Sequence, residues 1–287
     1  MPTKHSFVEK IKLPTYENRS LFKRALARYR MFTFDKRALP NFMIIGTQKG
    51  GTTSLYRYLA KHPQLSPNYV VKELSFFDEL YERGENWYRS NFPIVKPNHL
   101  YFEGCTHYLF NPLAPERIKK HIPDVKVIAL LRNPVDRAFS SYKHQVRAGR
   151  EDLSFEDAIK AEPERLNGEL ERMLNEPEYF SYNYNHFSYI ERGKYDLQIQ
   201  NWLRYFSIDN MLILSSEDFF SNPAQSIKQC FNFLGVNSIE INHKKKHNTG
   251  NYTDPITSET REKIQSTFEP HNNNLHSIID KDFKWNQ

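Results

Sequence analysis

Cysteine is nearly absent from this chain of 287 residues, and that shortage limits what the protein can be. Cys105 and Cys230 lie far apart, and neither belongs to a Cys-x-x-Cys or Cys/His spacing typical of a zinc site. A disulfide scaffold is therefore not expected, and a reducing compartment is favoured. Glycine is also scarce, with 10 residues against 21 Phe and 17 Tyr, so the composition favours a folded, aromatic-rich core over a disordered chain.

Long apolar segments are missing as well. No run approaches the roughly 20 residues that a transmembrane helix needs, and the first 12 residues lack the apolar stretch of a signal peptide. We therefore expect a protein without a transmembrane segment, located in the cytoplasm. The net charge of +6 favours a negatively charged partner, and by itself it leaves nucleic acid, a nucleotide, an acidic polysaccharide and a membrane surface open.

The sequence divides into a basic leader at 1–38 and one domain at 39–287. Between Arg19 and Arg37 the leader carries seven Lys/Arg and one acid, Asp35. Part of the leader is expected to be an amphipathic helix, because apolar residues recur at helical spacing at Leu21, Phe22, Ala25, Leu26 and Tyr29. We expect this apolar stripe to dock on the domain; contact with an acceptor, or peripheral contact with a membrane, is the alternative.

The domain alternates strands and helices along the chain. Short apolar runs predict buried strands at 42–45, 100–103, 126–131 and 211–214. Helices are predicted at 52–62, 136–147, 195–206, 223–234 and 258–268. This alternation is typical of an α/β fold with a central parallel sheet flanked by helices. In such a sheet, ligands bind beyond the carboxyl ends of the strands.

A glycine-rich loop from Gly46 to Thr53 lies between the first predicted strand and helix and is a candidate phosphate site. Its glycines let backbone N–H groups approach an anion, and the helix adds the positive end of its dipole. Lys49 adds a full charge, and the hydroxyl groups of Thr52 and Thr53 can donate to phosphate oxygens. The loop departs from the Walker A pattern, because Thr52 holds the place of its lysine. That shift favours a 5′-phosphosulfate over a β/γ-phosphate pair.

A second loop, from Leu131 to Ser140, follows the strand at 126–131. Arg132 closes the strand, and Ser140 lies about two turns into the next helix. A guanidinium and a hydroxyl on the same side can bind a terminal phosphate. An Arg-Asn-Pro helix start is common, so alone it is weak evidence for a phosphate site. The evidence is stronger when the first loop is taken with it.

The two loops together resemble those of sulfotransferases that use 3′-phosphoadenosine-5′-phosphosulfate (PAPS). The most similar branch contains the heparan sulfate N- and O-sulfotransferases and their bacterial relatives, and the similarity runs from about residue 41 to the C-terminus. The motifs that carry it are Gln48-Lys49-Gly50-Gly51-Thr52-Thr53-Ser54-Leu55, Leu131-Arg132-Asn133-Pro134, Ser140-Ser141-Tyr142, Glu73 with Phe76-Phe77-Asp78, Trp87-Tyr88, Tyr195 with Trp202-Leu203, and Phe233-Leu234-Gly235. The resemblance implies a P-loop-like α/β domain that moves a sulfuryl group to a hydroxyl or amine. The expected acceptor is a carbohydrate or polysaccharide.

The resemblance also implies how the donor and its product, 3′-phosphoadenosine-5′-phosphate (PAP), are held. The residues expected at the 5′-phosphosulfate are Lys49, Gly50, Gly51, Thr52, Thr53 and Ser54. Arg132 and Ser140 are expected at the 3′-phosphate. A basic loop at 243–250 matches the family loop that closes over the nucleotide, with Lys246 and Gly250 as its candidate contacts. No metal-ligand spacing is visible, and the family needs no metal to bind its donor.

Sulfuryl transfer resembles in-line phosphoryl transfer, so it needs a cation at the leaving oxygen and a base for the acceptor proton. Lys49 is the candidate cation. Glu73 matches the family's catalytic glutamate and is the candidate base, with Lys72 as an electrostatic aid at the acceptor. His144 matches a histidine that the N-sulfating branch keeps near its acceptor, and it is the rival base.

Two positions depart from that branch. Ser75 stands where the 3-O-sulfating enzymes usually have histidine, and Gly104 stands where a lysine often follows the glutamate. Two other functions stay open: a P-loop kinase for a small molecule, which the place of Lys49 disfavours, and a basic nucleic-acid-binding module. The second is disfavoured because the basic residues are spread through strand–helix loops. The predicted partners are therefore a nucleotide donor and a carbohydrate-type acceptor, and not nucleic acid.

Overall fold

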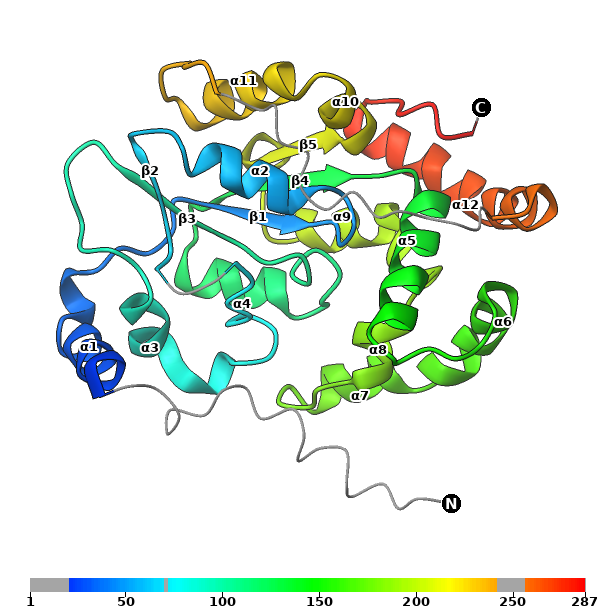
Figure 1. Cartoon of the computed structure of the whole chain (residues 1–287), viewed down its shortest axis with the longest axis horizontal. Coiled ribbons are helices and arrows are strands. Elements are labelled where there is room, and N and C mark those ends of the chain that lie inside the picture. The colour runs from blue at the N-terminus through cyan, green and yellow to red at the C-terminus, as the bar shows by residue number, and fades with distance from the viewer. Residues whose placement is uncertain (1–20, 70–71, 242–255, 287) are drawn as a thin grey trace.

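The computed structural model describes residues 21–69, 72–241 and 256–286. Within these residues one sheet of five strands forms the centre, in the spatial order β2-β3-β1-β4-β5 (Figure 1). The strands are β1 (Phe42–Gly46), β2 (Leu65–Pro67), β3 (Leu100–Gly104), β4 (Lys126–Leu131) and β5 (Met211–Ser215). All neighbouring pairs run parallel, which confirms the predicted α/β class.

Helices lie on both faces of the sheet and beside it (Figure 1). In chain order they are α1 (Leu21–Phe32), α2 (Thr52–Leu59), α3 (Gly84–Ser90), α4 (Ala114–His121), α5 (Pro134–Arg147), α6 (Phe155–Leu166), α7 (Glu169–Asn175), α8 (Tyr182–His186), α9 (Tyr195–Leu203), α10 (Ser216–Ser221), α11 (Pro223–Leu234) and α12 (Ser258–Ile279). None of these described helices is long and apolar enough to cross a membrane.

The central strands form because they are apolar on both faces. Every residue of β1 is buried, and so are five of the six residues of β4. Such runs are typical of parallel strands that helices cover on both sides. In the register of the sheet, Phe42 pairs with Phe102 of β3 and with Lys126 of β4. The loops that follow these three strands therefore emerge at the same edge.

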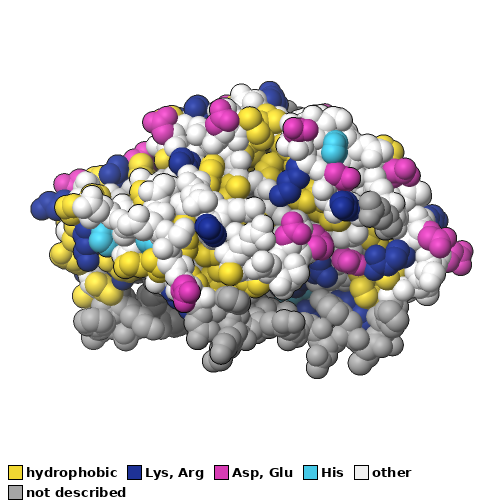
Figure 2. All heavy atoms as spheres, turned by 90° about the horizontal axis from the view of Figure 1, so that it is seen from above, with side chains coloured by type: hydrophobic (Ala, Val, Ile, Leu, Met, Phe, Trp, Pro, Cys, Tyr) yellow, Lys and Arg dark blue, Asp and Glu magenta, His cyan; other side chains and the backbone are white. Residues whose placement is uncertain are grey.

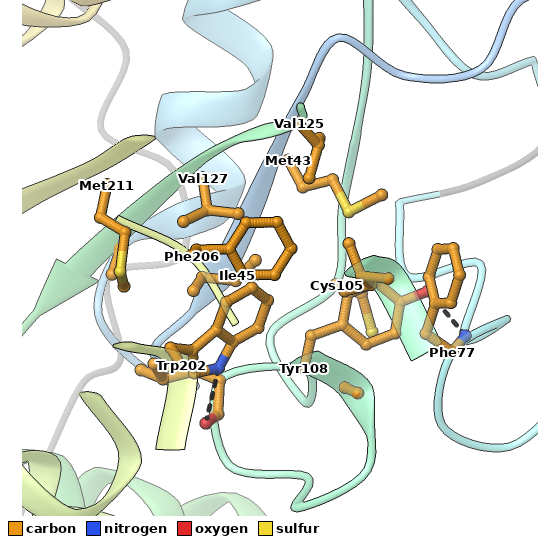
Figure 3. Close-up of a cluster of buried hydrophobic side chains, with 14 of the residues drawn as sticks. Met43, Ile45, Phe77, Cys105, Tyr108, Val125, Val127, Trp202, Phe206 and Met211 are labelled. Atoms are coloured by element: carbon orange, nitrogen blue, oxygen red, sulfur yellow. Dashed lines mark hydrogen bonds between the residues drawn. The ribbon is translucent and has the colours of Figure 1, made fainter. Parts of the chain in front are cut away.

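Side chains of β1 alternate between two hydrophobic clusters. Phe42 and Ile44 join the cluster that contains residues of α2 and α11. Met43 and Ile45 join the opposite cluster, which contains residues of α4 and α9. This alternation follows the period of two of a strand. Figure 3 shows the second cluster around Trp202, whose indole N–H donates to a backbone carbonyl at 3.3 Å.

The strands and helices predicted from the sequence are present, with differences at their ends. α2 stops at Leu59 and not at residue 62, because the chain turns there and the ring of His62 accepts the N–H of Gln64. α12 continues to Ile279, beyond the predicted end at 268, with Pro270 inside the helix. The pattern does not predict β2, which has three residues and ends in proline. It also does not predict α3, α4, α6, α7, α8 and α10.

Helix α1 lies in the basic leader, and the described part of its predicted apolar stripe is exposed. Ala25, Leu26 and Tyr29 are exposed. The helix is held by polar contacts. Arg37 donates from Nη1 to the carbonyl oxygen of Phe92 at 2.8 Å and from Nε to a carbonyl oxygen of α1 at 3.2 Å. These arginine contacts bind the helix to the domain.

Candidate active site

The loop after β1 holds its backbone against β4. A side chain at Gly50 would place its Cβ 2.4 Å from the carbonyl oxygen of Leu130. Gly51 has φ +94°, which favours glycine. The N–H of Thr47 donates to the same Leu130 carbonyl at 2.9 Å. The glycines are therefore required by the close approach of the loop to the neighbouring strand.

Helix α2 begins directly after this loop, at Thr52. The first N–H groups of an α-helix have no partner within the helix, and they carry the positive end of the helix dipole. The N–H of Ser54 is the first in this turn to find a backbone acceptor, the carbonyl of Gly51 at 2.9 Å. The side chains of Thr52 and Ser54 are buried, and that of Thr53 is half-buried. This arrangement suits the binding of an anion.

The loop after β4 is joined to the first loop by side chains. The half-buried Arg132 donates from Nη1 to the carbonyl oxygen of Lys49 at 3.2 Å, across 83 residues of sequence. The hydroxyl of Ser141 donates to Oε1 of Gln48 at 3.2 Å. Ser140 precedes Ser141 on α5 and is buried. Both candidate phosphate loops therefore form one continuous surface at the edge of the sheet.

The start of α5 is fixed by Asn133. Its Oδ1 accepts the N–H groups of Val135 at 3.0 Å and Asp136 at 3.3 Å. This cap stabilises the first turn, where the backbone donors have no partner within the helix. Because Arg132 lies just before the cap, the start of the helix and the arginine are positioned together.

Glu73 lies on a segment that crosses the end of β3. Its N–H donates to the carbonyl oxygen of Gly104 at 2.7 Å, and its φ is +69°. Its Oε1 accepts hydrogen bonds from Nζ of Lys72 at 2.7 Å and from Oγ1 of Thr106 at 2.9 Å. The side chain is 41% exposed. The carboxylate is therefore held by two donors and still accessible to a second molecule.

The charged side chains of the two loops act on one another. Burial alone would raise the pKa of Glu73, but the charge of Lys72 and the hydrogen bonds to the carboxylate outweigh burial and lower that pKa. Burial, together with the charges of Arg147 and Arg132, lowers the pKa of Lys49, and Glu73 opposes that shift. Two arginines and one carboxylate therefore act on the charge of Lys49.

His144 lies on the exposed side of α5. Partial burial and the charges of Lys49 and Arg147 lower the pKa of its imidazole, while the charge of Glu73 raises it. The neutral ring is therefore favoured at neutral pH. Lys49, Glu73 and His144 therefore lie close enough for their charges to affect one another's pKa values.

The family of this chain follows from comparison with known proteins. The family model described as the sulfotransferase domain matches residues 39–267. The chain belongs to the sulfotransferase domain family. The family implies PAPS as donor, and membership disfavours the kinase and the nucleic-acid-binding module that the sequence left open. Figure 2 shows one face of the protein, over which acidic and basic side chains are interspersed.

Two relatives of known activity also carry the name of this family. The sulfotransferase is 34% identical over 219 residues to the bifunctional heparan sulfate N-deacetylase/N-sulfotransferase 1 of Xenopus laevis, covering 71% of this chain and 23% of that protein. It is 30% identical over 212 residues to human heparan sulfate glucosamine 3-O-sulfotransferase 6, covering 71% of this chain and 54% of that protein. The alignments therefore span less than two thirds of either relative.

A solved sulfotransferase from Alicyclobacillus acidocaldarius has the same fold. It matches with a TM-score of 0.72 and 30% identity, over 87% of this chain and 100% of that one. The match confirms that the five-stranded parallel sheet and its flanking helices form the P-loop-like fold of sulfotransferases.

Most site residues predicted for the sulfotransferase lie on the three segments that follow β1, β2 and β4. They are Lys49, Gly50, Gly51, Thr52, Thr53, Ser54, Lys72, Glu73, Arg132, Ser140 and His144. Their roles stay predictions. Lys246 and Gly250 lie outside the described residues. The sequence reasoning missed Thr106 and Arg147, although Arg147 follows Ser140 and His144 at helical spacing and that spacing could have revealed it.

One group of side chains also has ligand types that bind metal ions. Asp78, Glu79 and His107 place ligand atoms within 4.8 Å of one another. The sequence spacing does not show this group, because the loop after β3 brings the histidine to the two acids. Burial and the charges of Asp78 and Glu73 raise the pKa of Glu79 to about 7. Exposed acidic groups of this kind are common without an ion, so the geometry assigns no metal to the sulfotransferase.

Tyr108 holds the segment that carries Glu73. Its hydroxyl oxygen accepts the N–H of Phe76 at 3.0 Å and the N–H of Phe77 at 3.3 Å; Figure 3 shows the second of these bonds. Tyr108 is fully buried. These two backbone donors therefore depend on one phenol for their acceptor.

The same tyrosine is tied to a buried acid at the end of β3. The hydroxyl of Tyr88 donates to Oε1 of Glu103 at 2.7 Å. Burial raises the pKa of Glu103 to about 8, although hydrogen bonds from Tyr88 and Tyr108 oppose the rise. The ring of Tyr88 stacks on Phe76, with centroids 4.5 Å apart. The segment of Glu73 is therefore fixed to β3 through side chains as well as through the Gly104 carbonyl.

We expect Tyr108→Phe to lower kcat by about 10- to 100-fold, because a small displacement of a catalytic group has that effect. The KM for PAPS should stay nearly unchanged, since Tyr108 does not contact the phosphate loops. Steady-state kinetics with an active acceptor measures both values.

Tyr101→Phe is the matched control. The hydroxyl of Tyr101 also accepts a backbone N–H, that of Lys96 at 2.6 Å, but it does not contact the segment of Glu73. Tyr108→Phe should lose about 1–3 kcal/mol of stability or more, because two buried amides lose their acceptor. Tyr101→Phe should lose less, because Lys96 is exposed and water can replace the phenol. If kcat falls no further in Tyr108→Phe than in Tyr101→Phe, Tyr108 does not position the site.

Proposed function

We propose that this sulfotransferase moves a sulfuryl group from PAPS to a hydroxyl or amine of a carbohydrate acceptor. The contact between Arg132 and the carbonyl of Lys49 is the observation that carries the proposal. It joins a helix N-terminus suited to one phosphate group with an arginine suited to another. A donor with phosphates at both its 5′ and 3′ positions fits such a pair of sites.

In this proposal PAPS lies across both loops. Its 5′-phosphosulfate meets the start of α2, and the proposed contacts are Lys49, Gly50, Gly51, Thr52, Thr53 and Ser54. Its 3′-phosphate meets Arg132 and Ser140. Lys246 and Gly250 remain proposed contacts of the nucleotide.

Lys49 is proposed to neutralise charge on the leaving oxygen. Burial and two nearby arginines lower the pKa of Lys49 before a ligand binds. An anionic phosphosulfate beside the ammonium opposes that shift and favours the charged form. The lysine is therefore most strongly charged when its charge is needed, as negative charge grows on the bridging oxygen.

Glu73 is proposed as the base that takes the acceptor proton. Its lowered pKa keeps it ionised at neutral pH, and its side chain is accessible. Lys72 and Thr106 orient the carboxylate through the bonds described above. Lys72 and His144 are proposed to contact the acceptor, with His144 as the rival base because its ring is neutral.

The names of the relatives support a carbohydrate acceptor, since both are heparan sulfate sulfotransferases. We propose no particular sugar and no position of sulfation, because Ser75 and Gly104 replace residues expected in those branches. We also infer a reducing compartment, and the two free, buried cysteines support it.

We expect Arg132→Ala to weaken PAP binding about tenfold or more. A charge-assisted hydrogen bond contributes about 1.5–3 kcal/mol, and 1.4 kcal/mol is a factor of ten in affinity. Adenosine 5′-phosphosulfate, which lacks the 3′-phosphate, should lose little affinity. Calorimetric titration of both ligands measures the difference, and equal weakening would show that Arg132 does not bind the 3′-phosphate.

We expect Glu73→Gln to lower the transfer rate by about 10²–10⁴, the range for a positioned general base. PAP affinity should survive, because Gln keeps the size of the side chain and the phosphates are held elsewhere. Single-turnover transfer of labelled sulfate and a PAP titration measure the two effects.

Two further variants separate the roles of the neighbouring residues. Lys49→Ala should damage both PAP binding and turnover, because the lysine touches the donor in this proposal. His144→Ala should cause a modest loss if the histidine only contacts the acceptor. Near-full turnover in Glu73→Gln with none in His144→Ala would transfer the role of base to His144.

A further inference from the structure

Helix α1 turns aromatic side chains away from the domain. Phe32 is 85% exposed and Tyr29 is 54% exposed. The two residues are three apart and therefore lie on the same side of the helix. Single exposed apolar residues are ordinary, but a contiguous exposed apolar patch is typical of a surface that binds a protein or a membrane.

More exposed apolar residues adjoin the end of α1. Val95 is 59% exposed, and Ile94 beside it is exposed as well. The N–H of Val95 donates to the carbonyl oxygen of Lys36 at 3.0 Å, and Ile94 forms a β-bridge with Arg37. These backbone contacts place the pair next to the turn that follows Phe32.

Basic residues lie among these apolar side chains. The sequence of α1 contains four Lys/Arg and no acid. Arg28, Lys36 and Lys96 are exposed, and so is the acid Asp35. The guanidinium of Arg30 lies over the ring of exposed Tyr69, 4.7 Å from its centroid. The surface thus combines large apolar groups with an excess of positive charge.

We propose that this surface binds an anionic lipid bilayer. We call it the α1 surface and define it by Arg28, Tyr29, Phe32, Lys36, Ile94, Val95 and Lys96. Aromatic and aliphatic side chains enter the interface of a bilayer, and Lys and Arg are attracted to its acidic headgroups. A soluble polyanion would use the cations, but it gives no role to a phenylalanine with 85% of its side chain exposed. The combination therefore favours a lipid surface.

The test uses the full chain and two kinds of vesicle. One is phosphatidylcholine alone, and in the other about a third of the lipid is phosphatidylserine, to give a negative surface potential. Flotation in a density gradient measures binding. The protein should bind the anionic vesicles at least about tenfold more tightly, and high salt should release it because salt screens the attraction.

Variants of the α1 surface test which residues bind. Each basic residue near an anionic surface changes binding about fivefold, so Arg28→Glu with Lys36→Glu should weaken binding at least about 25-fold. Phe32→Ser should weaken it about tenfold through lost apolar burial. The matched controls are Lys228→Glu on α11 and Leu174→Ser on α7, both exposed positions. All variants should bind PAP like the wild type, which shows that they are folded.

Three results would overturn the proposal. The first is equal binding of the wild type to both vesicle types. The second is equal loss in the α1 variants and their controls. The third is binding of the α1 surface to soluble heparin without binding to anionic vesicles, which would make it a polyanion site. The proposed reaction is tested separately, because none of these variants touches the phosphate loops.

Discussion

The parallel pairing of β1 with β4 is the constraint on which the rest of the site depends. Because the two strands run in the same direction, the loops after them leave the sheet at one edge, and the register shifts by one residue between Ile44 and Gly46, just before the first loop. The backbone of Gly50 then approaches the carbonyl of Leu130 so closely that no side chain fits. In this geometry Arg132 reaches the carbonyl of Lys49. The third segment follows β2, and the carbonyl oxygen of Gly104 at the end of β3 holds it by accepting the N–H of Glu73.

The electrostatics of this edge suit an anionic donor. Lys49, Arg132 and Arg147 repel one another, and burial adds to that cost, so the pKa of the lysine is lowered. An anion at the start of α2 relieves the repulsion. Glu73 lies near enough to act on the lysine, but its carboxylate is already compensated by Lys72. The cations can therefore hold the donor while the carboxylate of Glu73 stays available to an acceptor. Sulfuryl transfer needs both groups at once.

The sequence predicted the parts of this structure that depend on local patterns. Apolar runs located β1, β3, β4 and β5, and the glycine loop and the Arg-Asn-Pro start located the phosphate segments. It did not predict contacts that the tertiary fold creates, such as Thr106 on Glu73 or Tyr108 on the amides of Phe76 and Phe77. Docking of the α1 stripe stays a prediction, because hydrophobic periodicity shows that a helix has an apolar face and not which surface that face meets. The described members of the stripe, Ala25, Leu26 and Tyr29, are exposed.

A crystal structure of the full chain with PAP is the most direct test of the central claim. The account predicts the 5′-phosphate at the N-terminus of α2, within hydrogen-bond distance of Lys49 and the backbone N–H groups of its first turn. It predicts the 3′-phosphate on Arg132 and Ser140. PAP bound elsewhere, for example in the roughly 840 Å³ groove between α6 and α12, would contradict the account.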